Sequence, residues 1–239
     1  MLGRFAESSP RFKARLAGVF YILMILAGGL GGFARRGLVV GGDAAATATN
    51  IRAHEPLFRL GFAADILAVV CYIVVTVLLY DLFRPVNRNL SLLAAVFSLV
   101  GCTIQAVSDL FQLAPLIVLG NPPYLSVFKL DQLHALAYMS LKLYSQTYGI
   151  ALIFFGFYEL AIGCLILRSV FLPRVLGVLL VIAGLAGLTF LAPAFGAKYL
   201  PYILICDVGE MALVLWLLVK GVDAERWHEQ ASAAGIGRA

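Results

Sequence analysis

Acidic and amide side chains inside apolar stretches are the residues of this sequence whose types and spacing could support chemistry. An acidic side chain at the centre of a membrane-spanning helix costs about 3 kcal/mol, so it needs a partner, a proton or water. The residues of this kind that we expect to bind a ligand are Asp65, Gln105, Asp109, Gln112, Asp207 and Glu210. Glu159 lies deeper in its apolar stretch, and whether it or His134 belongs to any site stays open.

The spacing of these residues places them on shared helix faces. Asp207 and Glu210 are three residues apart, and Gln105, Asp109 and Gln112 follow at spacings of four and three. Together with an acid in the second apolar segment, they are expected to form one layer in the outer half of the membrane. Such a layer predicts an outward-facing polar cavity that binds or transports a small ligand or a cation. The same side chains could instead hydrogen-bond helices to one another, with some carboxyls protonated.

Six apolar segments must position these side chains. They are residues 14–33, 58–80, 90–119, 147–167, 174–192 and 201–219. Each is long enough to cross about 30 Å of hydrocarbon as a helix. The chain is 62% hydrophobic and 13% charged, about half the charge of a typical soluble domain, which excludes a water-facing globular surface. The sequence therefore predicts an all-α integral membrane protein that forms a six-helix bundle.

Two longer connections, 34–57 and 120–146, are predicted to carry short external helices. In the first, a Gly-Gly pair predicts a turn, Asp43 is a typical N-cap, and an alanine-rich stretch follows. In the second, an Asn-Pro-Pro sequence breaks the chain and a helix is expected to begin near Asp131. An unbroken helix from there would exceed the bilayer thickness, so we expect a bend near Gly149 or a separate external segment.

Lysine and arginine gather at the ends of the apolar segments that would share one side of a six-span chain. These residues are Arg4, Arg11, Lys13, Arg15, Arg84, Arg88, Arg168, Arg174, Lys220, Arg226 and Arg238. The positive-inside tendency places that side in the cytoplasm, so both termini are predicted to be cytoplasmic. Arg35 and Arg36 fall on the opposite side, in the connection after the first segment. The predicted organisation is a cytoplasmic segment at 1–13, a six-span domain at 14–220 and a cytoplasmic tail at 221–239.

The motifs of several function classes are missing from the sequence. No HExxH, CxxC or paired-histidine spacing occurs, so no metal ligand and no cofactor is predicted. No GxSxG is present, and catalytic residues are not identified. A net charge of +5 without a basic stripe or interleaved aromatics does not support nucleic-acid binding. The expected partner is the lipid bilayer, while a small ligand, a lipid, a cation and a protein partner remain open.

Five stretches resemble one known family. They are GDAAATATNI (42–51), LFRLGFAADIL (57–67), LYDLFRPVNRNLSLL (79–93), LDQLHALA (130–137) and FGFYELAIGCLILRSVFLPRVLGVLLVIAG (155–184). Together they resemble the uncharacterised, largely bacterial membrane family called domain of unknown function 4386, over about residues 12–221, with RSVFLPRVLGVLL as the most specific run. The resemblance implies a multi-pass protein of the bacterial cytoplasmic (inner) membrane and brings no activity, substrate or cofactor.

The chain departs from the family pattern at one place. Family members often carry histidine and glycine in the segment that matches Leu143–Gly149, whereas this sequence reads LYSQTYG there. Histidine-dependent chemistry is therefore not carried over to this chain.

Three functions are compatible with the sequence. The first is binding or transport in an outward-facing cavity built on Asp65, Asp109, Asp207 and Glu210. The second is an accessory or structural subunit of a membrane complex, whose acids serve helix contacts only. The third is an intramembrane enzyme that acts on a lipid through paired carboxylates, which is the least favoured of the three.

Overall fold

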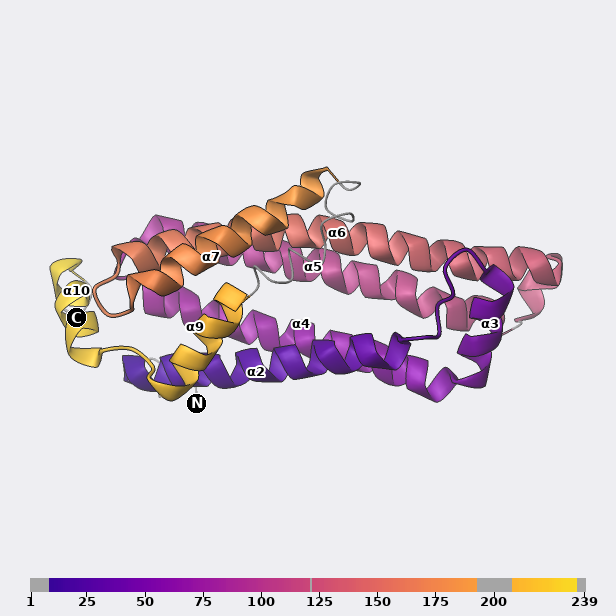
Figure 1. The fold of residues 1–239 in the computed structure, drawn as a ribbon, viewed down its shortest axis with the longest axis horizontal. Coiled ribbons are helices and arrows are strands. Elements are labelled where there is room, and N and C mark those ends of the chain that lie inside the picture. Colours follow the sequence, from indigo (N-terminus) through magenta and orange to yellow (C-terminus); the bar gives the residue numbers. More distant parts are fainter. Residues whose placement is uncertain (1–8, 121, 193–207, 236–239) are drawn as a thin grey trace. The chain divides into compact units, whose positions relative to one another are not determined.

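A computed structural model describes residues 9–120, 122–192 and 208–235 of the chain, and all regular structure in them is helical (Figure 1). The elements are α2 (Pro10–Arg35), α3 (Ala44–Ala53), α4 (Glu55–Phe83), α5 (Arg88–Leu119), η1 (Pro123–Leu125), α6 (Leu130–Arg168), α7 (Arg174–Gly187), η2 (Leu188–Leu191), α9 (Val208–Val219) and α10 (Ala224–Ala233).

Five helical runs in the described residues are long and apolar enough to cross a membrane. They are α2, α4, α5, α6 and the continuous run of α7 and η2 over 174–191. α9 is also apolar but has 12 residues, and the rest of the sixth expected segment, 201–207, lies outside the described residues. The chain is therefore an all-α membrane helical bundle, as the composition predicts.

The first long connection contains the predicted external helix, α3. Asp43 caps it, since the carboxylate accepts a hydrogen bond of 2.9 Å from the backbone N–H of Ala46. From the last turn of α3, the Arg52 guanidinium donates to the carbonyl of Leu119 at the end of α5, at 2.9 Å. Arg52 of α3 thereby satisfies a backbone carbonyl at the C-terminal end of α5.

The second long connection holds the 3₁₀ turn η1, and α6 then begins at Leu130. α6 has 39 residues and is helical without interruption through Gly149. At 1.5 Å per residue it is about 58 Å long, more than a hydrocarbon core requires. Among the described residues of this connection, the helical parts are thus η1 and the first turns of α6.

The chain divides into two compact units. Unit 1 comprises Met1–Ile22, Cys71–Cys102 and Ile150–Ala239, and unit 2 comprises Leu23–Val70 and Thr103–Gly149. Because the boundaries fall inside α2, α4, α5 and α6, each of these helices contributes one part to each unit.

In unit 1, glycines seven residues apart bring α6 and α7 into backbone contact. A Cβ on Gly163 would lie 2.9 Å from the carbonyl oxygen of Gly177, and a Cβ on Gly184 would lie 2.7 Å from that of Gly156. Small residues at such crossings are the usual means of close helix packing in membranes. This interface holds α7 against the C-terminal part of α6.

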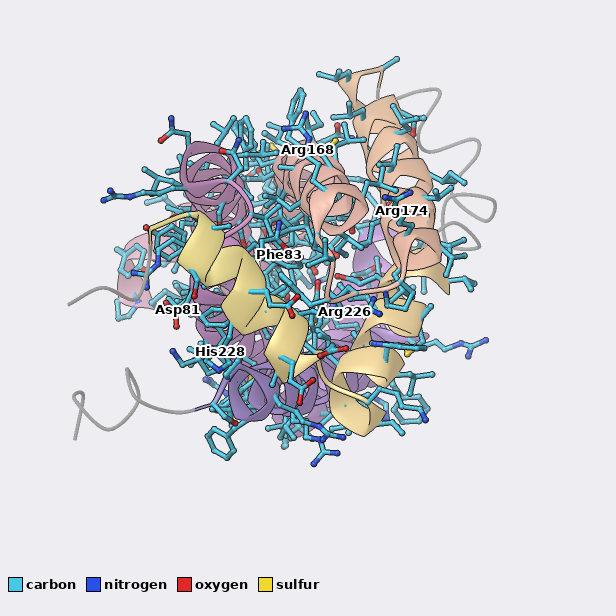
Figure 2. All side chains as sticks on the ribbon, turned by 90° about the vertical axis from the view of Figure 1, so that its left-hand side faces the viewer. Asp81, Phe83, Arg168, Arg174, Arg226 and His228 are labelled. Carbon is cyan, nitrogen blue, oxygen red and sulfur yellow. The ribbon has the colours of Figure 1, made fainter. Side chains whose placement is uncertain are left out.

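The helix ends of unit 1 meet at one basic end. Lys13 forms an ion pair with Asp81, and the indole N–H of Trp227 donates to the carbonyl of Leu82 at 2.9 Å. Figure 2 looks onto this end and shows α10, which carries Arg226, crossing in front of the helix ends, with Arg168 and Arg174 on the same end. Trp227 is therefore an anchor of α10 on the protein.

In unit 2, α3 covers an apolar core. Its buried members come from α3, the neighbouring helices and the connection before α3, and they are Leu38, Ala48, Ile51, Phe58, Leu119, Ala137 and Leu141. Away from this core, the helices of unit 2 bring charged side chains together.

Candidate functional site

An ion pair between α2 and α4 is the centre of a buried polar cluster in unit 2. Arg35, in the last turn of α2, pairs with Asp65 of α4, a residue that is 4% exposed. Gly31 leaves the space for this carboxyl, because a Cβ at that position would overlap it. The close approach of α2 and α4 thus depends on a glycine one turn before the arginine.

Tyr144 of α6 joins the same cluster from a third helix. Its hydroxyl lies 3.2 Å from Nη2 of Arg35, which donates to it, and the guanidinium lies 5.4 Å from the ring centroid. The Ser108 hydroxyl of α5 donates to the backbone carbonyl of Tyr144 at 2.8 Å. The arginine is therefore held by a carboxylate, a phenol and an aromatic face, and four helices contribute to the site.

Two buried polar residues of α5 stand beside this pair without hydrogen bonds. Asp109 is 1% exposed and Gln112 is fully buried, and within the described ranges neither carboxylate oxygen of the first nor either amide atom of the second has a hydrogen-bond partner. Asp109 is near enough to Asp65 and Arg35 to interact electrostatically. Gln112 approaches Asp65 without the geometry of a hydrogen bond.

The unpartnered state of Asp109 has an energetic consequence. A buried polar group without a partner costs about 1–3 kcal/mol, and a buried charge costs more unless it is paired. Arg35 pairs with Asp65, and the Asp109 carboxyl lies near both without pairing, so the cluster holds two acidic groups and one guanidinium. Gln105, one turn before Asp109, is half-buried and adds an amide on the same side of α5.

Glu210 belongs to unit 1, where it has its own partner. Its carboxylate accepts a hydrogen bond of 2.8 Å from the Tyr21 hydroxyl, and the Tyr21 ring packs edge-on against Tyr72 with centroids 5.7 Å apart. Asp207 lies outside the described residues. The single layer expected for Asp65, Asp109, Asp207 and Glu210 therefore stays a prediction, and the structure brings together the residues of α4 and α5 only.

Sequence reasoning missed two members of the cluster, Arg35 and Tyr144. Arg35 was assigned to the connection after the first apolar segment, yet it forms the last turn of α2 and faces Asp65. The signal for it was available, since an acidic residue in an apolar segment requires a cation and Arg35 follows the preceding segment directly. Tyr144 had no such signal, because tyrosine is common in membrane helices.

The cluster offers oxygen ligands and no soft ones. Carboxylate, amide and phenol oxygens suit a proton, an alkali cation or an organic cation. Among residues 9–120, 122–192 and 208–235, no three His, Cys, Asp or Glu side chains gather closely enough to hold a metal ion. The chemistry that the described residues support is therefore weak cation binding by one carboxylate next to a fixed ion pair.

Comparison with known proteins gives a relative and a family. The chain is 26% identical over 155 residues, which is 65% of its length and 80% of the relative, to an Archaeoglobus fulgidus protein named "Uncharacterized protein". No solved structure matches the chain. The sequence pattern of one family matches residues 16–221, which include the buried cluster of unit 2. The chain is thus a member of the family described as "Domain of unknown function (DUF4386)".

Proposed function

We propose that this membrane protein binds a small cation at the buried cluster of unit 2, with Asp109 as the residue that holds it. The observation that carries the proposal is the Asp109 carboxylate, which is 1% exposed and has no hydrogen-bond partner in the described part of the chain. A cation would supply the missing interaction, and the neighbouring Gln112 amide, also without a partner, would add an oxygen ligand.

The Arg35–Asp65 pair has a different role in this proposal. Because Arg35 is engaged by Asp65 and by Tyr144, it neutralises one carboxylate of the site and leaves the other for the ligand. A fixed guanidinium also weakens cation binding, which would keep the affinity low enough for release. Low affinity with a buried site is what a transport protein needs, and transport of the bound cation is the finer form of the proposal.

We further propose that each of the six apolar segments crosses the membrane once, with both termini and the basic end of unit 1 in the cytoplasm. The ion pair of Lys13 and the contact of Trp227 support a common location for the start of α2, the end of α4 and α10. The positive-inside tendency then orients that end. The predicted division into 1–13, 14–220 and 221–239 and the location in a bacterial inner membrane belong to the same proposal.

Thermal unfolding of the detergent-purified protein tests cation binding. We expect sodium chloride to raise the Tm of the wild type relative to choline chloride at equal ionic strength, because a ligand that binds only the folded state stabilises it by mass action. Asp109→Asn should lose this difference, and Gln112→Leu should reduce it. Asp131→Asn is the matched control, since Asp131 is an exposed acid at the start of α6.

The same measurement can reject the proposal. If neither sodium, potassium nor lithium shifts the Tm of the wild type, or if Asp131→Asn removes the shift as fully as Asp109→Asn, cation binding at Asp109 is wrong. Sodium-dependent uptake into proteoliposomes that is lost in Asp109→Asn would extend binding to transport.

A structural role is the second candidate, and the ion pair itself favours it. Arg35 links α2 to α4 and α6, so the cluster could serve helix contacts in an accessory subunit. In that case Asp109→Asn should raise the Tm in every salt, since the change removes an unpaired carboxylate. Co-purification of a stoichiometric membrane partner would support this role directly.

An intramembrane enzyme receives the least support. Paired-carboxylate catalysis needs two carboxyls that both reach one substrate atom. Asp65 is engaged by Arg35, so the pair of Asp65 and Asp109 has a single carboxyl that is unoccupied by protein groups in the described residues.

A further inference from the structure

A pocket at the basic end of unit 1 is separate in sequence and chemistry from the cluster of unit 2. Its volume is about 590 Å³, and it lies between the first turns of α2, the connection from α6 to α7, the end of α9 and the start of α10. Every one of these segments belongs to unit 1. The pocket is therefore built by three chain segments that are far apart in sequence, because the end of α9 and the start of α10 are contiguous.

Three cations line this pocket, namely Arg11, Lys220 and Arg226. In the part of the chain that the structure describes, neither Arg11 nor Lys220 takes part in an ion pair. Arg226 makes only long contacts, at 3.5 Å to the Asp223 carboxylate and at 3.5 Å to the carbonyl of Val170. The cationic groups are thus largely available to an anion.

Gly221 fixes the position of two of these cations. Its φ of +69° ends α9, and its N–H donates to the carbonyl of Trp216 at 3.0 Å, as in a helix C-terminal turn. A Cβ there would lie 3.1 Å from Cγ of Arg11, so the arginine stem packs directly on the glycine. The turn consequently brings the stem of Arg11 against the residue that follows Lys220.

The remaining lining is of two kinds. Phe171, Leu172 and Pro173 from the α6–α7 connection, with Trp216 from α9, give an apolar wall. The two acids, Asp223 and Glu225, lie at the start of α10, where the Asp223 carboxylate is occupied as the N-cap that accepts from the N–H of Arg226 at 3.2 Å. The pocket therefore combines available cations with an apolar wall, which suits an amphipathic anion.

We propose that this pocket binds the phosphate of an anionic phospholipid head group. Arg11 and Lys220 contact the phosphate, and the apolar wall at Trp216 contacts the glycerol and the upper acyl chain. Basic pockets between membrane helices are general sites for such head groups, and tryptophan is typical of the head-group level. A soluble phosphate ester offers the same anion without the apolar part, so it is the alternative source of the ligand. The site goes beyond the proposed cation binding and does not depend on it.

Native mass spectrometry of the full chain in detergent, with added phosphatidylglycerol, measures this binding. Each cation near a head group contributes about 1 kcal/mol, which is about fivefold in affinity. Arg11→Gln with Lys220→Gln should therefore weaken phosphatidylglycerol binding roughly thirtyfold. Phosphatidylcholine should bind much less than phosphatidylglycerol to the wild type.

The matched control is Arg168→Gln with Arg174→Gln. These two cations lie on the same end of unit 1, as Figure 2 shows, and neither lines the pocket. The control variant should keep the affinity of the wild type within about twofold, because its charges belong to the surface around the site. Equal weakening in both double variants would overturn the proposal, since it would assign binding to diffuse surface charge.

Further measurements decide whether the bound phosphate comes from a lipid or from a soluble ester, and a single variant replaces the double variant if that one does not fold. Glycerol 3-phosphate that displaces phosphatidylglycerol, and binds with similar affinity, would identify the soluble ester as the ligand of the same cations. Equal binding of phosphatidylcholine and phosphatidylglycerol would overturn selection for an anionic head group. If the double variant does not fold, Lys220→Gln alone changes an exposed side chain and should weaken binding about fivefold.

Discussion

The two units of this protein differ in how the acidic side chains of their apolar helices are partnered. In unit 1 the buried hydroxyls of Thr76 and Ser98 satisfy each other at 2.6 Å, and Glu210 accepts from Tyr21. In unit 2 the Arg35–Asp65 pair is satisfied, while Asp109 and Gln112 lack hydrogen-bond partners among the described residues. A buried hydroxyl without a hydrogen-bond partner among the described residues also occurs in unit 1, at Tyr158, but the buried acid in that state belongs to unit 2 and is the group whose missing interaction points to a ligand.

The two units also differ in how closely their helices pack at glycines. Backbones of α6 and α7 touch through glycines in unit 1, so that interface has no room for additional atoms. In unit 2 the glycine at position 31 makes room for a carboxyl, and its neighbour Gly32 faces open space. Close packing gives unit 1 its stability, whereas unit 2 uses the same small residue to admit a charge.

The largest expected effect comes from the glycine contact of unit 1. Gly184→Leu would force a side chain into the Gly156 carbonyl at 2.7 Å and the Leu160 backbone at 2.8 Å. Overpacking a core by extra methylenes typically costs about 1–3 kcal/mol, and a whole side chain pressed against two backbones that cannot shift is expected to cost more than the loss of a buried ion pair. We expect little folded protein by size-exclusion chromatography in detergent. Gly32→Leu, with no atom within 4 Å of its Cβ, is the control and should fold normally.

Breaking the ion pair of unit 2 is expected to have the next largest effect. Arg35→Gln leaves the buried Asp65 carboxylate without its cation, which costs about 3–5 kcal/mol in a buried pair. Adding Asp65→Asn should recover most of the lost Tm, because the uncompensated charge is gone. Equal Tm values for the single and the double variant would show that an uncompensated Asp65 charge is not the cause of the loss.

Breaking the hydroxyl pair of Thr76 and Ser98 in unit 1 is expected to have a smaller effect on stability. Thr76→Val removes one partner of the 2.6 Å contact with Ser98 and should cost about 0.6–2 kcal/mol, as for other hydrogen bonds between membrane helices. The change in Tm of Thr76→Val combined with Ser98→Ala should be smaller than the sum of the two single changes. Additive losses would mean that the two hydroxyls do not interact.

The smallest change in Tm is expected for the exposed ion pair at the start of α4. Arg59 and Glu55 are one turn apart at 2.8 Å, with side chains that are 58% and 48% exposed. Pairs of this kind contribute about 0.3–0.5 kcal/mol, so Arg59→Gln should change the Tm by about 1 °C or less. A loss as large as that of Arg35→Gln would contradict the contrast between buried and exposed charge in unit 2.

Much of the fold follows from local sequence. The apolar segments at 58–80 and 90–119 correspond to α4 and α5, and Asp43 caps α3 as predicted, because capping and hydrophobic length act within a few residues. The uninterrupted course of α6 through Gly149 did not follow, since a single glycine is tolerated inside a helix. The prediction of a bend or a separate segment relied on bilayer thickness, which a helix can exceed by projecting into water.

The candidate site was predicted in part. Asp65, Asp109 and Gln112 were identified because a polar residue in an apolar segment is expensive, and that cost is visible in sequence. The sequence does not show which of the two carboxyls, Asp65 or Asp109, pairs with Arg35 and which one stays unpaired. Gln105 is half-buried beside them, Glu210 interacts with Tyr21 in unit 1, and Asp207 lies outside the described residues.

The sequence by itself determined that this protein is helical and belongs in a membrane, because so apolar a chain can satisfy its backbone polar groups in hydrocarbon only within helices. It also determined which side chains are expensive to bury. The tertiary structure alone decided that Arg35 pairs with Asp65 and that Asp109 has no hydrogen-bond partner in the part of the chain described. That choice depends on how closely α2 and α4 approach at Gly31, and contacts between helices are set by packing that no local pattern encodes.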